Sequence, residues 1–219
     1  MSLTVTETWD SLDDGWRAAL EEAWWSWCAG SAGVGAAVVD ANGAVVARDR
    51  NRRADALHSS PLGGSRIAHA EMCVLASMPD GSFADCTLYT TFEPCLMCAS
   101  AIILCGVPRV HYAAADPVWD GMHDWFTSLP MAAKRRPERE CLGGPLGAFA
   151  HVLHLSWLAL WVPESDAVEL HRSVAPNHVE LARDLVASSH LPAIAAAGGS
   201  VTDAVAALWP DLVTLSSPS

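Results

Sequence analysis

Three side chains that bind borderline metal ions stand at the start of two predicted helices. His69 opens one helix, and Cys95 and Cys98 open the other, directly after a predicted strand. Cysteines three positions apart share one face of a helix, so both sulfur atoms can reach the same ion. The positive end of the helix dipole favours the thiolate, which is the form that binds zinc. One nitrogen and two sulfur ligands therefore predict a site for one Zn²⁺ ion per chain.

A carboxylate accompanies these ligands. Three protein ligands leave one position of a tetrahedral zinc ion open to water, which distinguishes a catalytic site from a structural one. Glu71 lies two residues after His69, where it can take a proton from that water and pass protons to a leaving group. A structural zinc site would need a fourth ligand, such as Cys73 or Cys86, and would leave Glu71 without a role. A thiol redox pair at the Cys-x-x-Cys motif is a further alternative.

The complete pattern resembles that of a known enzyme family. It reads His69-Ala70-Glu71 and then Pro94-Cys95-Leu96-Met97-Cys98, which matches the H-x-E…P-C-x-x-C signature of zinc-dependent nucleobase deaminases. Residues 34–116 resemble the cytidine deaminase-like superfamily, most closely the branch of the guanine and tRNA adenosine deaminases. The resemblance implies hydrolytic release of ammonia from a small aminated heterocycle, either a nucleobase or a nucleoside. The Glu-Pro-Cys-x-Met-Cys form of the motif favours a guanine-like purine.

The resemblance also implies roles for single residues. Glu71 would be the catalytic residue, and the backbone N–H groups of Ala70 and Cys95 would help to hold the attacking oxygen. Asn51 stands just after the second predicted strand, where the family has an asparagine that contacts the base. The alternative for Asn51 is a turn residue before a long loop. The family's fold is a three-layer α/β/α sandwich with a mixed five-stranded sheet, usually dimeric or larger, and we expect a homodimer.

Aromatic and polar residues follow the last strand of this region. The carboxyl end of that strand should open near the zinc site, where aromatic rings can stack on a base and polar groups can bind its edge. We predict that the substrate contacts come from this group, namely Trp119, Asp120, His123 and Phe126. Packing or exposure to solvent is the alternative for each of them.

The motifs require a layered framework. An Asn42-Gly43 turn joins two predicted strands, and an α/β layered fold follows from the alternation of strands with helices. Ser11 is the expected cap of the first helix. The predicted helices cover residues 12–29, 69–78 and 94–105, and the predicted strands cover residues 34–40, 44–48, 87–91 and 109–113.

The sequence changes character after residue 115. We interpret the basic cluster Lys134-Arg135-Arg136 with Arg139 as a solvated loop, and residues 143–147 as another loop. Several short helices are predicted from Ala148 onward. We therefore predict a deaminase domain over residues 1–130 and a mainly helical extension over residues 131–219, packed on the core.

An apolar stretch from Pro145 to Pro163 contains His151 and His154. We interpret it as a buried helix or strand, because polar groups within a membrane are costly. The two histidines could suggest a second metal, but neither has an obvious third ligand. Ser200 and Asp203 resemble a capping pair for the last helix.

Composition limits the partners. Lys and Arg total 13 against 25 Asp and Glu, which gives a net charge of −12. Such a chain is poorly suited to nucleic acid, which disfavours tRNA adenosine deamination. Seven cysteines without regular spacing suggest reduced thiols, and with no signal or membrane segment visible we expect a cytoplasmic protein. Deamination of a secondary metabolite or drug, and a non-catalytic deaminase-like subunit, stay open as alternatives.

Overall fold

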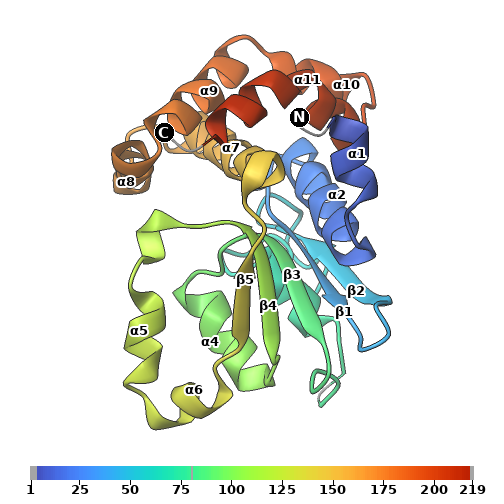
Figure 1. Cartoon of the computed structure of the whole chain (residues 1–219), viewed down its shortest axis with the longest axis vertical. Helices are drawn as coiled ribbons and strands as arrows, with labels where there is room; N and C mark the ends of the chain where they lie inside the picture. Colours follow the sequence, from blue (N-terminus) through green and yellow to red (C-terminus); the bar gives the residue numbers. More distant parts are fainter. Residues whose placement is uncertain (1–3, 80, 218–219) are drawn as a thin grey trace.

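A mixed five-stranded sheet forms the centre of the computed structural model, which describes residues 4–79 and 81–217 (Figure 1). The strand order is β2-β1-β3-β4-β5. Strand β1 pairs antiparallel with both β2 and β3, whereas β3, β4 and β5 run parallel. The strands are β1 (Gly35–Val39), β2 (Val45–Arg50), β3 (Thr87–Phe92), β4 (Arg109–Ala114) and β5 (Glu138–Cys141). The expected mixed sheet of five strands is confirmed.

Helices cover both faces of this sheet. Helix α2 packs on β1, β2 and β3, and α7 continues this layer over β3 and β4, while α3 packs on the opposite face beside α4. The helices are α1 (Val5–Asp10), α2 (Asp14–Cys28), α3 (Ala70–Ala76), α4 (Leu96–Cys105), α5 (Met122–Thr127), α6 (Pro130–Arg135), α7 (Gly144–Trp161), α8 (Asp166–Val174), α9 (Pro176–Ala187), α10 (His190–Ala196) and α11 (Val201–Leu215), with a short 3₁₀ helix, η1, at Pro117–Trp119. The layered α/β/α expectation is confirmed.

The start of the first long helix differs from the prediction. Asp13, not Ser11, caps α2 by accepting a hydrogen bond from the backbone N–H of Trp16. Ser11 instead ends the short helix α1, which the sequence analysis did not predict. A capping box of Thr4 and Glu7 begins α1. The N-terminal segment thus forms two helices, because Thr4 and Asp13 each accept hydrogen bonds from the free N–H groups at the start of a helix.

Two expectations for the region after residue 130 are wrong. Arg139 does not lie in a solvated loop, because it belongs to β5 and forms an ion pair with Glu93. Residues 143–147 are not a loop, since α7 begins at Gly144. Pro145 suits the first turn of a helix, and Gly147 allows α7 to approach β4, where a Cβ atom would lie 2.5 Å from the Ala113 carbonyl oxygen.

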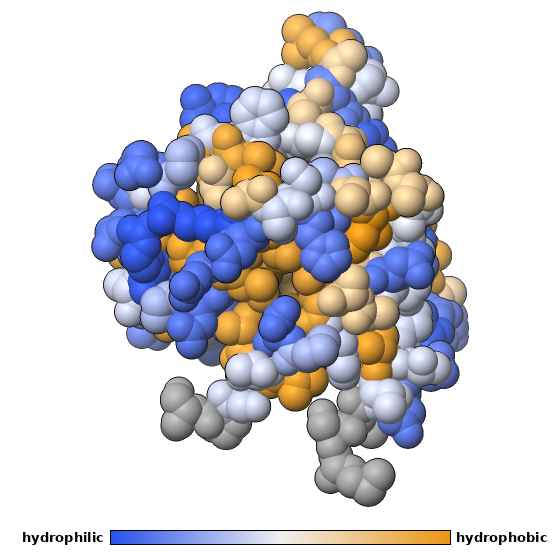
Figure 2. All heavy atoms as spheres, turned by 90° about the horizontal axis from the view of Figure 1, so that it is seen from above, coloured by the Kyte–Doolittle hydropathy of each residue, from blue (hydrophilic) through white to orange (hydrophobic). Residues whose placement is uncertain are grey.

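The helices after β5 form a cap over one end of the sheet (Figure 1). Helix α7 packs against α9 and α11, and buried leucines such as Leu153, Leu208 and Leu212 join the cap to the main core. Seen from above, the cap shows hydrophobic residues among hydrophilic ones (Figure 2). The predicted domain boundary between residues 130 and 131 stays a prediction. Strand β5 lies after this boundary in the sequence, although it completes the sheet of the deaminase domain. Within the described residues, no helix is both long and apolar enough to cross a membrane.

A close contact between α2 and β1 gives a testable stability effect. A Cβ atom at Gly35 would lie 2.2 Å from the Ala19 carbonyl oxygen and 2.3 Å from the Ala23 nitrogen. We expect Gly35→Ala to lower the free energy of unfolding by about 3 kcal/mol, because both close atoms belong to the backbone and an overpacked core must shift it. Chemical denaturation measures this change. Gly81→Ala is the comparison: a Cβ atom there meets nothing within 4 Å, although its φ is +77°, so it should cost about 1 kcal/mol. Equal losses in the two variants would contradict the packing explanation.

Candidate active site

The three predicted metal ligands meet where two helices begin. His69 is the N-cap residue of α3, and Cys95 is the N-cap residue of α4. The Nδ1 atom of His69 lies 3.5 Å from the Sγ atoms of both Cys95 and Cys98. The two sulfur atoms are 3.6 Å apart. Residues from two separate helices thus form one compact group.

The spacing of these atoms fits a tetrahedral metal ion. With Zn–N and Zn–S bonds of about 2.0 and 2.3 Å, tetrahedral ligands lie about 3.5–3.8 Å apart. Among the residues that the structure describes, this is the one metal-binding group. Cys73 and Cys86 lie outside it, so neither supplies the fourth ligand of a closed structural site. The chemistry of the three donors fits an open zinc site.

Glu71 lies against the ligand group from the first turn of α3. The Oε2 atom of Glu71 lies 3.5 Å from the Sγ atom of Cys98, and the Glu71 side chain is buried. Burial raises the pKa of this carboxyl above its usual value, because the charged form loses its contact with water. A carboxyl group at this position can exchange protons with molecules bound at the ligand group.

The two cysteines differ in their tendency to ionise. The hydrogen bond from Cys98 stabilises the thiolate of Cys95 and lowers the pKa of Cys95 to about 4. The same hydrogen bond, together with burial, raises the pKa of Cys98. One thiolate is therefore available before a metal arrives, and metal binding at such a pair releases the other proton.

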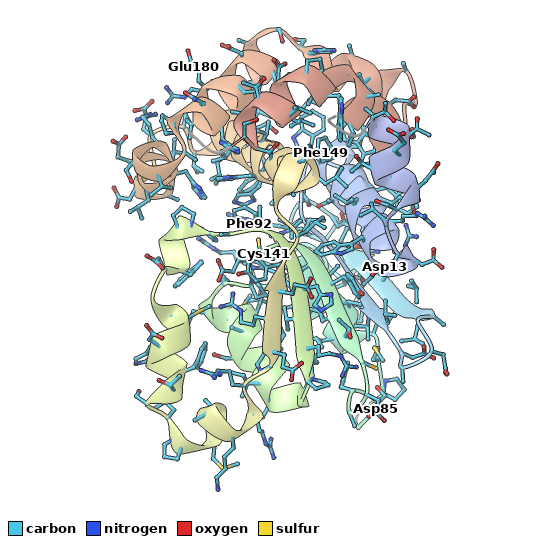
Figure 3. The ribbon with its side chains drawn as sticks, in the orientation of Figure 1. Asp13, Asp85, Phe92, Cys141, Phe149 and Glu180 are labelled. Carbon is cyan, nitrogen blue, oxygen red and sulfur yellow. The ribbon has the colours of Figure 1, made fainter. Side chains whose placement is uncertain are left out.

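A cavity of about 230 Å³ opens at this group, at the end of the sheet that faces the helical cap. Phe92, at the end of β3 below α7, lines this cavity (Figure 3). Strands, loops and cap helices all contribute to the wall. The lining includes Asn51, Arg53, His69, Glu71, Phe92, Cys95, Asp116, Trp119, His154, Trp157 and His171. The cap helices α7 and α8 therefore form part of the candidate site.

Comparison with known proteins identifies the family. The family described as the cytidine and deoxycytidylate deaminase zinc-binding region matches residues 10–114. A tRNA-specific adenosine deaminase of Streptococcus pyogenes serotype M18 is 33% identical over 117 residues, which are 52% of this chain and 69% of that protein. The chain belongs to the cytidine deaminase-like family of zinc-binding deaminases. Members of this family are hydrolytic enzymes that act on C–N bonds.

Other members of the family show how far the similarity extends. A cytosine deaminase of Candida albicans is 34% identical over 105 residues, which are 46% of this chain and 65% of that protein. The chain thus spans less than two thirds of that family member. A structure of guanine deaminase from Nitrosomonas europaea has a TM-score of 0.51 and 20% identity, and it covers 73% of this chain and 87% of that one. This likeness shows the shared fold. The cap helices α7–α11 follow the segment that matches the family.

The two substrate contacts taken from the family resemblance lie at the ligand group. Asn51 lines the cavity just after β2, and its Oδ1 atom accepts a hydrogen bond from the backbone N–H of Arg53 at 3.0 Å. The Oδ1 atom of Asn51 therefore has the role expected of a turn residue, while its amide nitrogen stays available for a ligand. Ala70 is the first residue of α3 and is buried. Their contact with substrate remains a prediction.

The residues predicted after β4 do not all reach the candidate site. Trp119 lines the cavity with Glu71. Asp120 lines a second, more open cavity of about 630 Å³, which Trp119 also borders. Phe126 is buried beside Met122 in a small cluster against which Trp119 packs. The side chain of His123 lies outside the described part of the structure. Trp119 is thus the one of the three described side chains that reaches the candidate site.

The sequence analysis did not single out Glu93, Asp116 and His171, which also line the cavity. Asp116 follows β4, and its Oδ1 atom lies 3.6 Å from Nε2 of His171 on α8. The Nδ1 atom of His171 lies 2.9 Å from Nε2 of His151 on α7. Glu93 accepts a hydrogen bond from the backbone N–H of Asp116 and pairs with Arg139 of β5. Asp116 is the last residue of the segment that resembles the family, and this position could have indicated a site residue. His171 lies far from that segment in the sequence, and only the fold brings it to the cavity.

The buried histidines predict a loss of stability at mildly acidic pH. Burial lowers the pKa of His151 to about 2, that of His154 to about 3 and that of His171 to about 4. Below pH 6.5 the unfolded chain binds protons at these positions and the folded chain does not, so stability falls as the pH falls. At pH 5.5 each histidine costs on the order of 1 kcal/mol. Burial raises the pKa of Asp116 to about 7, which offsets part of this loss.

Urea unfolding at pH 7.5 and pH 5.5 measures this effect. The wild-type protein should be less stable at pH 5.5, and His151→Phe should reduce the difference, since it removes one of the three groups. Any release of zinc at low pH acts on both proteins alike. Equal pH dependence in the two proteins would contradict the assignment of the loss to this cluster.

Proposed function

We propose that the protein is a zinc-dependent hydrolytic deaminase that releases ammonia from a small aminated heterocycle, with a guanine-like purine as the favoured substrate. The observation that carries the proposal is the placement of Glu71. Its carboxyl group lies against the ligand group of His69, Cys95 and Cys98 and faces the same cavity. A structural metal site would not need a buried carboxyl group at this position.

His69, Cys95 and Cys98 would hold one Zn²⁺ ion. When bound, zinc lowers the pKa of water so that it can act as a nucleophile near neutral pH. Glu71 accepts a proton from the attacking water and donates it to a ring nitrogen of the substrate. Glu71 then takes the second proton from the hydroxyl group on the ring carbon and passes it to the amino group. The C–N bond breaks, ammonia leaves, and the ring carbon keeps the water oxygen as a carbonyl. The amide nitrogen of Asn51 orients the substrate, and the backbone N–H groups of Ala70 and Cys95 help to hold the attacking oxygen.

The size and charge of the cavity support a small substrate. Its volume of about 230 Å³ lies below the range of about 300–1,000 Å³ that is usual for drug-sized ligands. Its lining includes the carboxyl groups of Glu71, Glu93 and Asp116 and the guanidinium group of Arg53, and Arg139 pairs with Glu93. The carboxyl groups outnumber this one lining cation, which favours an uncharged ring over a phosphorylated substrate.

Ammonia release tests the proposal. Purified, zinc-loaded protein would be assayed with guanine, adenine, cytosine, isocytosine, their nucleosides, pterins and aminotriazines. We expect release of ammonia with at least one of them, led by guanine. Zinc binding without ammonia release from any of these compounds would contradict the proposal. That result would favour a specialised metabolite or a non-catalytic subunit.

The second candidate is tRNA adenosine deamination, which the similarity to the tRNA-specific enzyme of Streptococcus pyogenes favours. The net charge of −12 opposes it, because affinity for RNA depends on neutralising phosphates. A binding titration with tRNA at low salt separates the two candidates. Tight, salt-sensitive binding would support the tRNA candidate, and absence of binding would exclude it. Assembly as a homodimer and a cytoplasmic location remain predictions.

A further inference from the structure

A histidine of the helical cap reaches the cavity of the candidate catalytic residue. His154 lies on α7, and its side chain lines the cavity together with Glu71 and Asn51. Its Nδ1 atom is buried without a hydrogen-bond partner. Among the other side chains that the structure describes, no buried nitrogen or oxygen is left unpaired. Since buried polar groups are almost always hydrogen-bonded, the imidazole has hydrogen-bonding capacity that no protein group uses, and its ring is half-buried where it lines the cavity.

The neighbours of His154 hold its ring in place but give its Nδ1 atom no hydrogen-bond partner. The ring stacks on Phe92 with the centroids 4.4 Å apart and the planes at 26°, and Phe92 has no polar side-chain atom. The imidazole of His171, which also lines the cavity, lies 6.3 Å from that of His154 between centroids. Its two nitrogens already face His151 and Asp116. The packing therefore holds His154 in place without giving it a partner.

The charge state of His154 indicates the kind of group that it can bind. Burial and the neighbouring imidazoles lower its pKa to about 3, so the ring is neutral at physiological pH. A neutral imidazole offers one N–H donor and one nitrogen acceptor. It gives no electrostatic advantage to a phosphate or a carboxylate. Its natural partner is an uncharged ring N–H, ring nitrogen, amino or carbonyl group.

We propose that His154 is a specificity-determining residue, which binds the edge of an uncharged, planar heterocycle through a ring nitrogen. The inference rests on the proposed function and adds a contact from the cap, which lies outside the segment that matches the family. Asn51 supplies a second neutral polar group, and Trp119 and Trp157 supply apolar surface in the same cavity. A free base with polar atoms on two edges satisfies this arrangement.

Substitution at His154 tests the contact. His154→Phe keeps a ring against Phe92 and removes both nitrogens. The substrate tested is the best base among guanine, adenine and cytosine. We expect its kcat/KM to fall about tenfold, mainly through a higher KM, because the loss of one hydrogen bond changes a binding constant by about tenfold. Zinc content should not change. His154→Gln restores a polar group and should recover part of the loss. His178→Phe is the matched control, because His178 lines the other cavity.

A binding measurement separates this inference from the proposed function. In a Glu71→Ala background, the best base should quench the fluorescence of the tryptophans in the cavity, and adding His154→Phe should raise its Kd about tenfold. If wild-type protein deaminates a base and His154→Phe changes neither kcat/KM nor Kd, the role of His154 is overturned and the function stands. If wild-type protein neither deaminates nor binds any of the three bases, both proposals are overturned. Equal effects of His154→Phe and His178→Phe would also overturn the inference.

Discussion

Replacing Glu71 with alanine is expected to lower the rate of deamination by roughly 10²–10⁴-fold, the usual contribution of a positioned general acid–base group. The loss should appear in kcat, because Glu71 acts on protons that move during the reaction. Zinc content should remain at one ion per chain, since the three ligands are unchanged. Ammonia release and metal analysis on the same preparation measure both quantities.

Two further variants make this result specific. Glu71→Gln keeps the size of the side chain and removes its ability to carry a proton, so it should be as inactive as the alanine variant. Glu138→Gln changes an exposed carboxylate on β5 and should be fully active. An active Glu71→Gln enzyme, or a Glu71→Ala enzyme that loses its zinc, would refute the assignment of Glu71 as the proton carrier.

Replacing Cys98 with alanine is expected to remove both zinc and activity. Cys98 is fully buried, and its sulfur contacts His69, Cys95 and Glu71 at 3.5–3.6 Å. Two ligands remain after the substitution, which are too few for a stable zinc site. We expect the zinc content after dialysis to fall from one ion per chain towards zero. The activity should fall at least as far as in Glu71→Ala.

Cys73→Ala is the matched control for the loss of zinc. Cys73 is another buried cysteine, on α3, but it lies outside the ligand group. Burial raises the pKa of its thiol to about 12, so it stays protonated and is a poor ligand. The variant should keep its zinc. Loss of zinc from Cys73→Ala, or full zinc content in Cys98→Ala, would contradict the ligand assignment.

The sequence predicts the ligand group well because that group depends on local geometry. His69 and Glu71 share the first turn of one helix, and Cys95 and Cys98 share the first turn of another. A helix fixes such relations over a few residues. The strand before each motif could likewise be recognised from its apolar, β-branched residues.

The parts that the sequence does not predict depend on distant contacts. Strand β5 has the sequence Glu-Arg-Glu-Cys and is largely exposed, so only its pairing with β4 makes it a strand. His171 reaches the cavity because α8 folds back against η1, and no local pattern indicates this. Phe126 was predicted from its position after β4, but it packs in a separate cluster. Proximity along the chain was therefore a poor guide to the wall of the cavity.

Mass analysis of the product formed in ¹⁸O-labelled water tests the central claim most directly. Zinc-loaded protein would be incubated in this water with each base and nucleoside of the substrate panel. Hydrolytic deamination predicts a product in which one amino group is replaced by labelled oxygen, with one ammonia released per product. A product without the label, or zinc-loaded protein that converts none of these compounds, would contradict the account.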